Sequence, residues 1–234
     1  MLRILAGKTS YRKSRLFAVA ACRPLVRLLI TDRPYLNERI QKTLSIVEAD
    51  TDDRVDPKTR DNLDSWVRCD VNEIVSKRPW ASVRAAGKAL EALTRWCAWE
   101  DTSRPFVDVD GNINNVMQPV QAVAQLVVEA VKCAASKEWN AVRDHELKCQ
   151  SDLLRDIFGN PFRASTSPPA AWLNMNVIGL AQAVYDERAF DRMPILADAL
   201  EDAGCTNGEF LNHCRSDRDH VRGCWVVDLL LGKA

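Results

Sequence analysis

The sequence lacks the patterns that mark membrane proteins and several enzyme classes. It has no apolar run near 18 residues, so no segment predicts a transmembrane helix. It has no glycine-rich phosphate loop, no Gly-x-Ser-x-Gly pattern and no His-Glu-x-x-His pattern, each of which points to a defined chemistry. We therefore predict no catalytic residues, no cofactor and no contact with a membrane.

Signals for β-strands are also scarce. Only nine of the 234 residues are glycine, runs of β-branched residues are few, and the helix-favouring residues Ala, Leu, Arg and Glu are common. Apolar residues recur at helical spacing along most of the chain. These features predict an all-α protein, an irregular array of many helices with no sheet.

A break near the middle of the chain divides the predicted helices. Residues 103–117 are rich in Pro, Asn and Asp, which favour turns over helices. We expect this loop to join an N-terminal helical region, residues 1–103, to a C-terminal helical domain, residues 117–234. The chain is long enough for one large domain or two small ones.

Helix signals are clearest in the last third of the chain. Thr206 and Glu209 have the spacing of a capping box, which predicts that a short helix begins there. A polar turn follows, and the final helix is predicted from about residue 219 to Gly232. This helix is apolar nearly all round, so we expect Trp225 and Leu229 to lie in the core.

Eight cysteines and three histidines supply side chains that can bind metals. The cysteines are far apart, so we interpret them as reduced thiols that pack like small apolar side chains. Five of these side chains gather in one stretch, namely Cys205, His213, Cys214, His220 and Cys224. One alternative is a zinc site formed by Cys205, Cys214, His220 and Cys224, since thiolate and imidazole are usual zinc ligands and the last two share one face of the predicted final helix. Most structural zinc sites use close cysteine pairs, which are missing here. We therefore predict no bound metal and no convergence of the three sulfur atoms.

The first 30 residues contain seven basic residues and no acidic one. Ser10 predicts the start of a helix in which Arg12, Lys13 and Arg15 are candidates for contact with nucleic acid. The alternative is that these residues pair with acidic neighbours, because residues 48–64 contain seven acids against three bases. The zero net charge of the whole chain favours ion pairing.

A short motif in the first 22 residues is relevant to where the protein is located in the cell. The sequence Val-Ala-Ala-Cys that ends at Cys22 has the shape of a lipoprotein cleavage site. A signal peptide needs an apolar region of about 7–15 residues before that site, and only residues 16–21 are apolar here. We interpret the motif as the interior of a helix and expect a cytoplasmic protein.

Long blocks of the sequence resemble one large paralogous family of uncharacterised bacterial proteins from planctomycete-type genomes. The C-terminal blocks are LLRDIFGNPFR, YDERAFDRMPILADALEDAGC and HVRGCWVVDLLLGK, and the family's opening block is similar to LAGKTSYRKSRLFAVAACR. The resemblance covers about residues 1–30 and 150–234, and it implies a class of protein rather than an activity. Family members carry a further segment before the opening block, so we expect that the start at Met1 is truncated or misassigned.

These observations favour a non-catalytic helical module that acts in regulation or in protein–protein interaction, with another protein as its partner. A nucleic-acid-binding protein that uses the basic first helix is the alternative from another class. A zinc-stabilised domain is the third.

Overall fold

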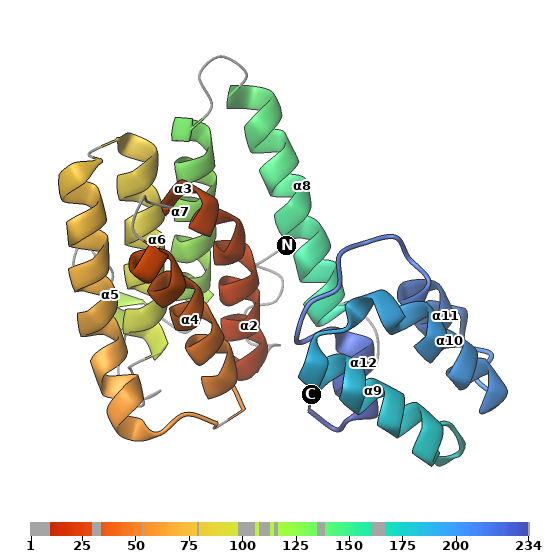
Figure 1. The fold of residues 1–234 in the computed structure, drawn as a ribbon. Helices are drawn as coiled ribbons and strands as arrows, with labels where there is room; N and C mark the ends of the chain where they lie inside the picture. The colour runs from red at the N-terminus through yellow and green to blue at the C-terminus, as the bar shows by residue number, and fades with distance from the viewer. Residues whose placement is uncertain are drawn as a thin grey trace. The chain divides into compact units, whose positions relative to one another are not determined.

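The protein is all-α, as the spacing of its apolar residues predicts (Figure 1). The computed structural model describes residues 10–29, 34–52, 54–78, 80–97, 106–107, 113–114, 117–134, 139–160 and 167–233. The only strands in these ranges are β1 (Phe106–Val107) and β2 (Ile113–Asn114), which pair in antiparallel fashion. The prediction of no sheet needs this one correction, but strands of two residues are too short to form a layer of the fold.

Helices make up most of the described residues. In chain order they are α2 (Tyr11–Cys22), α3 (Val26–Leu29), α4 (Pro34–Asp50), α5 (Pro57–Lys77), α6 (Ala81–Cys97), α7 (Met117–Ala134), α8 (Trp139–Phe158), α9 (Met175–Glu187), α10 (Met193–Asp202), α11 (Gly208–Cys214) and α12 (Trp225–Leu230). None of the helices described is both long enough and apolar enough to cross a membrane.

The chain forms two compact units, Met1–Ser151 and Asp152–Ala234. The predicted boundary at residues 103–117 is therefore too early, and most of that loop lies outside the described residues. The physical reason is that α7 packs against α6 and α2, which makes it part of the first unit. The division falls within α8, so the last turns of this helix belong to the second unit.

The first helix that the structure describes, α2, is largely buried. The side chain of Ser10 accepts the backbone N–H of Lys13 at 3.3 Å and caps the helix as predicted. All residues from 14 to 22 are buried. Cys22 is the last residue of α2 and is fully buried, in agreement with its interpretation as helix interior.

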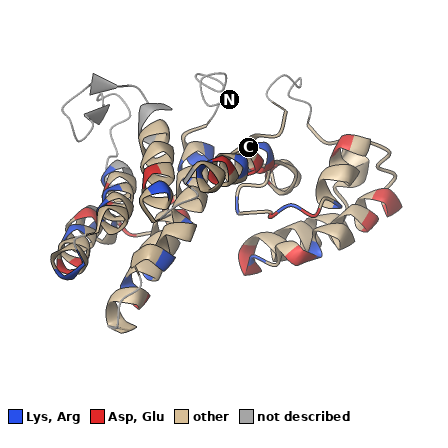
Figure 2. Ribbon diagram, turned by 90° about the horizontal axis from the view of Figure 1, so that it is seen from above, with Lys and Arg blue, Asp and Glu red and all other residues tan. Residues whose placement is uncertain are grey.

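Acidic side chains at the end of α4 neutralise the arginines of α2. Nε of Arg12 lies 3.1 Å from Oδ1 of Asp52, and the guanidinium of Arg15 pairs with Asp50. Figure 2 shows that basic and acidic segments are interleaved along the helices of this unit. The prediction that the basic helix pairs with acidic neighbours is therefore confirmed.

The second unit has a hydrophobic core formed by α9, α10, α11 and α12. At its centre the ring of Phe210 meets Trp172 and Trp225 edge to face, with centroids 5.4 and 4.8 Å apart. Trp225 is only 3% exposed, so its predicted place in the core is confirmed. Leu229 is only partly buried and packs at the margin of this core, which corrects the prediction for that residue.

Two predicted helix starts differ from the structure. The N-cap of α11 is Asn207, whose side chain accepts the backbone N–H of Glu209 at 2.9 Å, so the cap lies one residue after Thr206. The final helix begins only at Trp225. Gly223 has a φ angle of 98°, a left-handed conformation that interrupts a right-handed helix. The residues just before Trp225 therefore form a turn.

Candidate functional site

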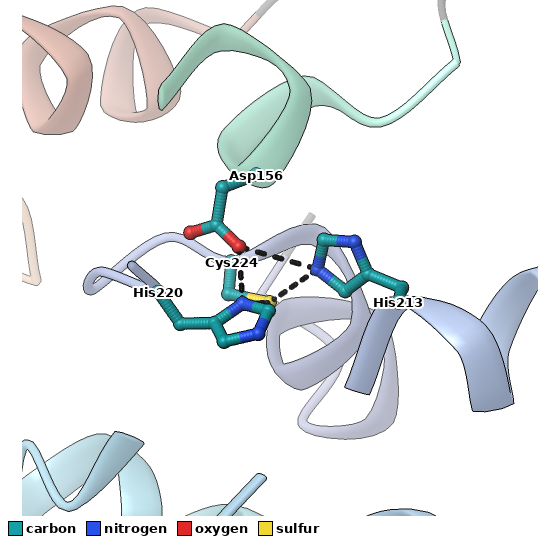
Figure 3. A group of neighbouring side chains, drawn as sticks. All are labelled: Asp156, His213, His220 and Cys224. Atoms are coloured by element: carbon teal, nitrogen blue, oxygen red, sulfur yellow. Dashed lines mark hydrogen bonds and ion pairs between the residues drawn. The ribbon is translucent and has the colours of Figure 1, made fainter. Parts of the chain in front are cut away.

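Four side chains with metal-binding atoms converge in the second unit (Figure 3). They are Asp156, His213, His220 and Cys224, and one donor atom from each lies within 4.8 Å of the other three. Asp156 is in the last turn of α8, His213 is in the last turn of α11, His220 lies in the following turn, and Cys224 is the N-cap of α12. We call these four residues the Asp-His-His-Cys cluster.

The donor atoms of the cluster surround a common point. Oδ1 of Asp156 lies 2.6 Å from Nδ1 of His220 and 3.2 Å from Nε2 of His213. Sγ of Cys224 lies 3.2 Å from the same Nε2 atom of His213 and 4.0 Å from Nδ1 of His220. One carboxylate oxygen, two imidazole nitrogens and one sulfur therefore share a single small volume.

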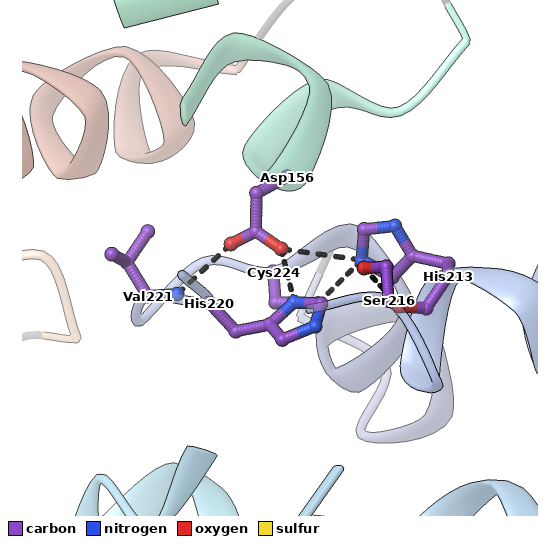
Figure 4. A network of polar contacts seen from close by, with 6 residues as sticks. All are labelled: Asp156, His213, Ser216, His220, Val221 and Cys224. Carbon is purple, nitrogen blue, oxygen red and sulfur yellow. Dashed lines mark hydrogen bonds and ion pairs between the residues drawn. The ribbon is translucent and has the colours of Figure 1, made fainter. Parts of the chain in front are cut away.

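Backbone hydrogen bonds hold the segments that carry the cluster (Figure 4). The N–H of Val221 donates to Oδ2 of Asp156 at 2.9 Å, which ties the turn to the end of α8. The N–H of Cys224 donates to the carbonyl of Val221 at 2.9 Å and closes the turn that Gly223 permits. Ser216 Oγ donates to the carbonyl of His213 at 2.8 Å, where α11 ends. These three bonds connect the end of α8, the end of α11 and the turn before α12 around the cluster.

Aromatic packing fixes the ring of His213. Its centroid lies 4.9 Å from that of His220, in an edge-to-face arrangement, and 5.1 Å from that of Trp225. Because Trp225 is itself held in the hydrophobic core, the imidazole of His213 is supported from the interior of the unit. The ring is thereby oriented with Nε2 toward Asp156 and Cys224.

The cluster is closed to solvent. The side chains of Asp156, His220 and His213 are 2%, 4% and 11% exposed, and Cys224 is fully buried. The four donor atoms are therefore largely shielded from solvent, and His213 is the most exposed member of the cluster. A closed set of four donors is typical of structural metal sites, whereas catalytic sites keep one position for water or substrate.

Burial and neighbouring charge act on the ionisable groups of the cluster. Burial by itself raises the pKa of Asp156, but hydrogen bonds from His213 and His220 outweigh it, so the pKa lies below its ordinary value and the group is a carboxylate. Burial, and next the charge of Asp156, raise the pKa of Cys224 well above its ordinary value. A thiol at this position keeps its proton unless a cation replaces it.

One buried nitrogen of the cluster has no partner in the described residues. Nε2 of His220 is buried and makes no hydrogen bond there, while Nδ1 of the same ring points to Asp156. An unpaired buried polar atom has a desolvation cost of about 1–3 kcal/mol. The ring of His220 keeps this orientation although Nε2 is unpaired. The contacts made by Nδ1 therefore determine how the ring is oriented.

The cluster contains only two of the four zinc candidates proposed from the sequence. His220 and Cys224 belong to it, but they do not share a helical face, because the residues between them form a turn. Cys205 and Cys214 are buried in the hydrophobic core of the same unit and are not among the four clustered residues. Burial, followed by the charges of Asp156 and Cys205, raises the pKa of Cys214 to about 12, so this thiol is protonated.

The sequence did not indicate Asp156 as a member of the cluster. His213 was among the five ligand-type side chains noted between Cys205 and Cys224, but it was left out of the predicted zinc set. Asp156 lies 64 residues before His220, and no local spacing links the two. Only the packing of the end of α8 beside the turn brings this carboxylate into the cluster.

The three candidates for nucleic-acid contact on α2 do not form an accessible basic surface. Arg15 is only 6% exposed and is paired with Asp50, and Arg12 is paired with Asp52. Lys13 is partly exposed. With both arginines engaged by carboxylates, α2 lacks the row of accessible cations that phosphate binding needs.

No protein-family model, curated protein or solved structure matches this chain. The chemistry of the Asp-His-His-Cys cluster therefore has to be argued from its own atoms.

Proposed function

We propose that this protein is a non-catalytic helical module that binds another protein, either as a scaffold or as a regulator. The observation that carries the proposal is the closure of the Asp-His-His-Cys cluster. Within the described residues, this is the group in which His, Cys and acidic side chains converge, and its side chains are largely buried. Such a cluster suits a structural role, and we assign recognition of the partner to the surfaces of the helices.

Two further features support a protein partner over nucleic acid. The arginines of α2 that could contact phosphates are already paired with Asp50 and Asp52. In the second unit, Leu173 and Met175 expose large apolar side chains at the start of α9, and Met175 is 91% exposed. Exposed apolar side chains favour contact with protein rather than with a phosphate backbone.

We also propose that the protein acts in the cytoplasm. Cys205, Cys214 and Cys224 are reduced thiols in one small unit. Reduced cysteines at this density are typical of a compartment that keeps thiols from forming disulfides.

Site-specific photo-crosslinking in living cells tests the proposed interaction. A photoreactive amino acid at Met175 should give a discrete covalent adduct with one partner protein, identified by mass spectrometry. The same probe at Glu209, which is also exposed and lies on α11, serves as the control and should not give that adduct. Adducts with nucleic acid, or the same set of adducts from both positions, would contradict the proposal.

A further inference from the structure

We propose that Asp156, His213, His220 and Cys224 bind one zinc ion as a structural site of the second unit. This inference concerns the architecture of the unit and does not depend on the identity of the partner proposed above.

The donor set matches zinc better than other common protein metals. Zinc is bound by cysteine sulfur, histidine nitrogen and carboxylate oxygen, most often with four ligands. Calcium and magnesium require oxygen ligands, but three of the four donors here are nitrogen or sulfur. Copper(I) and iron–sulfur clusters favour several thiolates, and the cluster has only Cys224.

The separations between donor atoms fit a tetrahedral ion. Bond lengths of about 2.0–2.3 Å and tetrahedral angles place the ligand atoms of a zinc site about 3.3–3.8 Å apart. The four distances given above run from 2.6 to 4.0 Å and bracket this range. Zinc would lengthen the contact between Asp156 and His220 and shorten the contact between Cys224 and His220. Both adjustments are small side-chain movements.

Hydrogen bonds alone do not satisfy all the donor atoms of the cluster well. Nε2 of His213 lies 3.2 Å from both Oδ1 of Asp156 and Sγ of Cys224, and a single N–H can be well aligned with only one of these atoms. A dication at the common point would contact all four donors together. It would also balance the buried negative charge of Asp156 and allow Cys224 to bind as a thiolate.

The outer contacts of Asp156 suit a ligand that uses one oxygen. Oδ1 faces the cluster, whereas Oδ2 accepts the backbone N–H of Val221 at 2.9 Å. Such hydrogen bonds to ligating carboxylates orient them and are a regular part of metal sites. The carboxylate is therefore already fixed with Oδ1 directed at the other donor atoms of the cluster.

The four ligands join segments that have little support of their own. The two helices beside the cluster, α11 and α12, contain seven and six residues, and isolated helices of this length are not stable in water. The turn that carries His220 and the end of α8 complete the site. Because the unfolded chain does not present such a site, zinc binding would add directly to the folding free energy of the unit.

Elemental analysis of the full chain tests the proposal. The protein is expressed in zinc-supplemented medium, freed of any affinity tag and passed through a chelating column before analysis. We expect one zinc per chain. Cys224→Ser should lose stoichiometric zinc, whereas Cys205→Ser should keep it, since Cys205 is an equally buried thiol of the same unit outside the cluster.

Cobalt(II) provides a second measurement that does not depend on the folding of a variant. Metal-free wild-type protein titrated with cobalt should saturate at one equivalent, with the intense visible bands of a tetrahedral ion and a sulfur-to-cobalt charge-transfer band. Folded wild-type protein without stoichiometric zinc, a weak octahedral cobalt spectrum, or full zinc retention in Cys224→Ser would each overturn the proposal.

Discussion

Nδ1 of His220 lies 2.6 Å from Oδ1 of Asp156, although 64 residues separate the two in the chain. This contact joins the end of α8 to the turn before α12. The other oxygen of Asp156 holds the backbone of Val221 in the same turn, so one carboxylate secures the entry to the final helix. The contribution of the Asp156 carboxylate to the stability of the second unit can be measured directly.

Asp156→Asn should destabilise the second unit. The substitution keeps the shape of the side chain but removes the buried negative charge that accepts hydrogen bonds from two histidines, and a hydrogen bond to a charged group contributes about 1.5–3 kcal/mol. Urea unfolding monitored by tryptophan fluorescence measures the loss. Asp152→Asn on the same helix is the matched control, because its ion pair with Arg155 is largely exposed and such pairs contribute about 0–1 kcal/mol. Equal effects of the two substitutions would refute the structural role of Asp156.

Trp225→Ala should cost about 3–5 kcal/mol, as for other buried aromatic residues. Its ring packs on Phe210 and His213, so the truncation leaves a cavity between α11 and α12. Leu229→Ala should cost clearly less, since that side chain is only partly buried. Thermal denaturation of both variants gives the comparison, and an unchanged midpoint for Trp225→Ala would place α12 outside the core.

Thiol reactivity should separate the cysteines into two groups. The thiolate is the reactive form, and burial raises the pKa of Cys214 to about 12, so both access and ionisation protect this residue. Brief alkylation of native protein followed by peptide mass spectrometry should modify the exposed residues Cys69, Cys133 and Cys149 and spare the buried residues Cys22, Cys205, Cys214 and Cys224. Rapid modification of Cys214 in the native protein would show that the core of the second unit is open.

The basic first helix should contribute to stability rather than to nucleic-acid binding. Arg15→Ala should lower the stability of the first unit, because buried Asp50 would lose one of its two arginine partners among the described residues and keep its contact with Arg60 at 2.7 Å. The wild-type protein should bind duplex DNA no more tightly than about 10 μM at physiological salt, weaker than specific DNA-binding proteins. Fluorescence anisotropy tests this. Submicromolar binding that is lost when Arg12, Lys13 and Arg15 become alanine would favour the nucleic-acid alternative.

Local sequence patterns predicted those parts of the fold that depend mainly on residue type and spacing. Apolar spacing predicted the helical class, Ser10 predicted the start of α2, and the acidic run near residue 50 predicted its ion pairs. The first division of the chain was misplaced because contacts of α7 with α6 and α2 are invisible in a local pattern. The resemblance of the terminal blocks to a bacterial family stays a prediction.

The candidate site could be predicted only in part. His220 and Cys224 are close in sequence and were recognised, but they were assigned to a helix because the apolar residues around them suggested that the final helix continued through Gly223. The positive φ of that glycine creates the turn instead. Asp156 could not be found from spacing, since its position depends on tertiary packing.

Hydrogen–deuterium exchange with and without bound zinc tests the central claim most directly. After chelation, backbone amides of α11 and α12 should exchange much faster than in the zinc-loaded protein, because the ion joins those helices to α8 and to the turn at His220. Amides of α5 and α6 in the first unit should be unaffected and serve as the internal control. Unchanged protection of α11 and α12 after complete removal of metal would contradict a structural zinc site in the second unit.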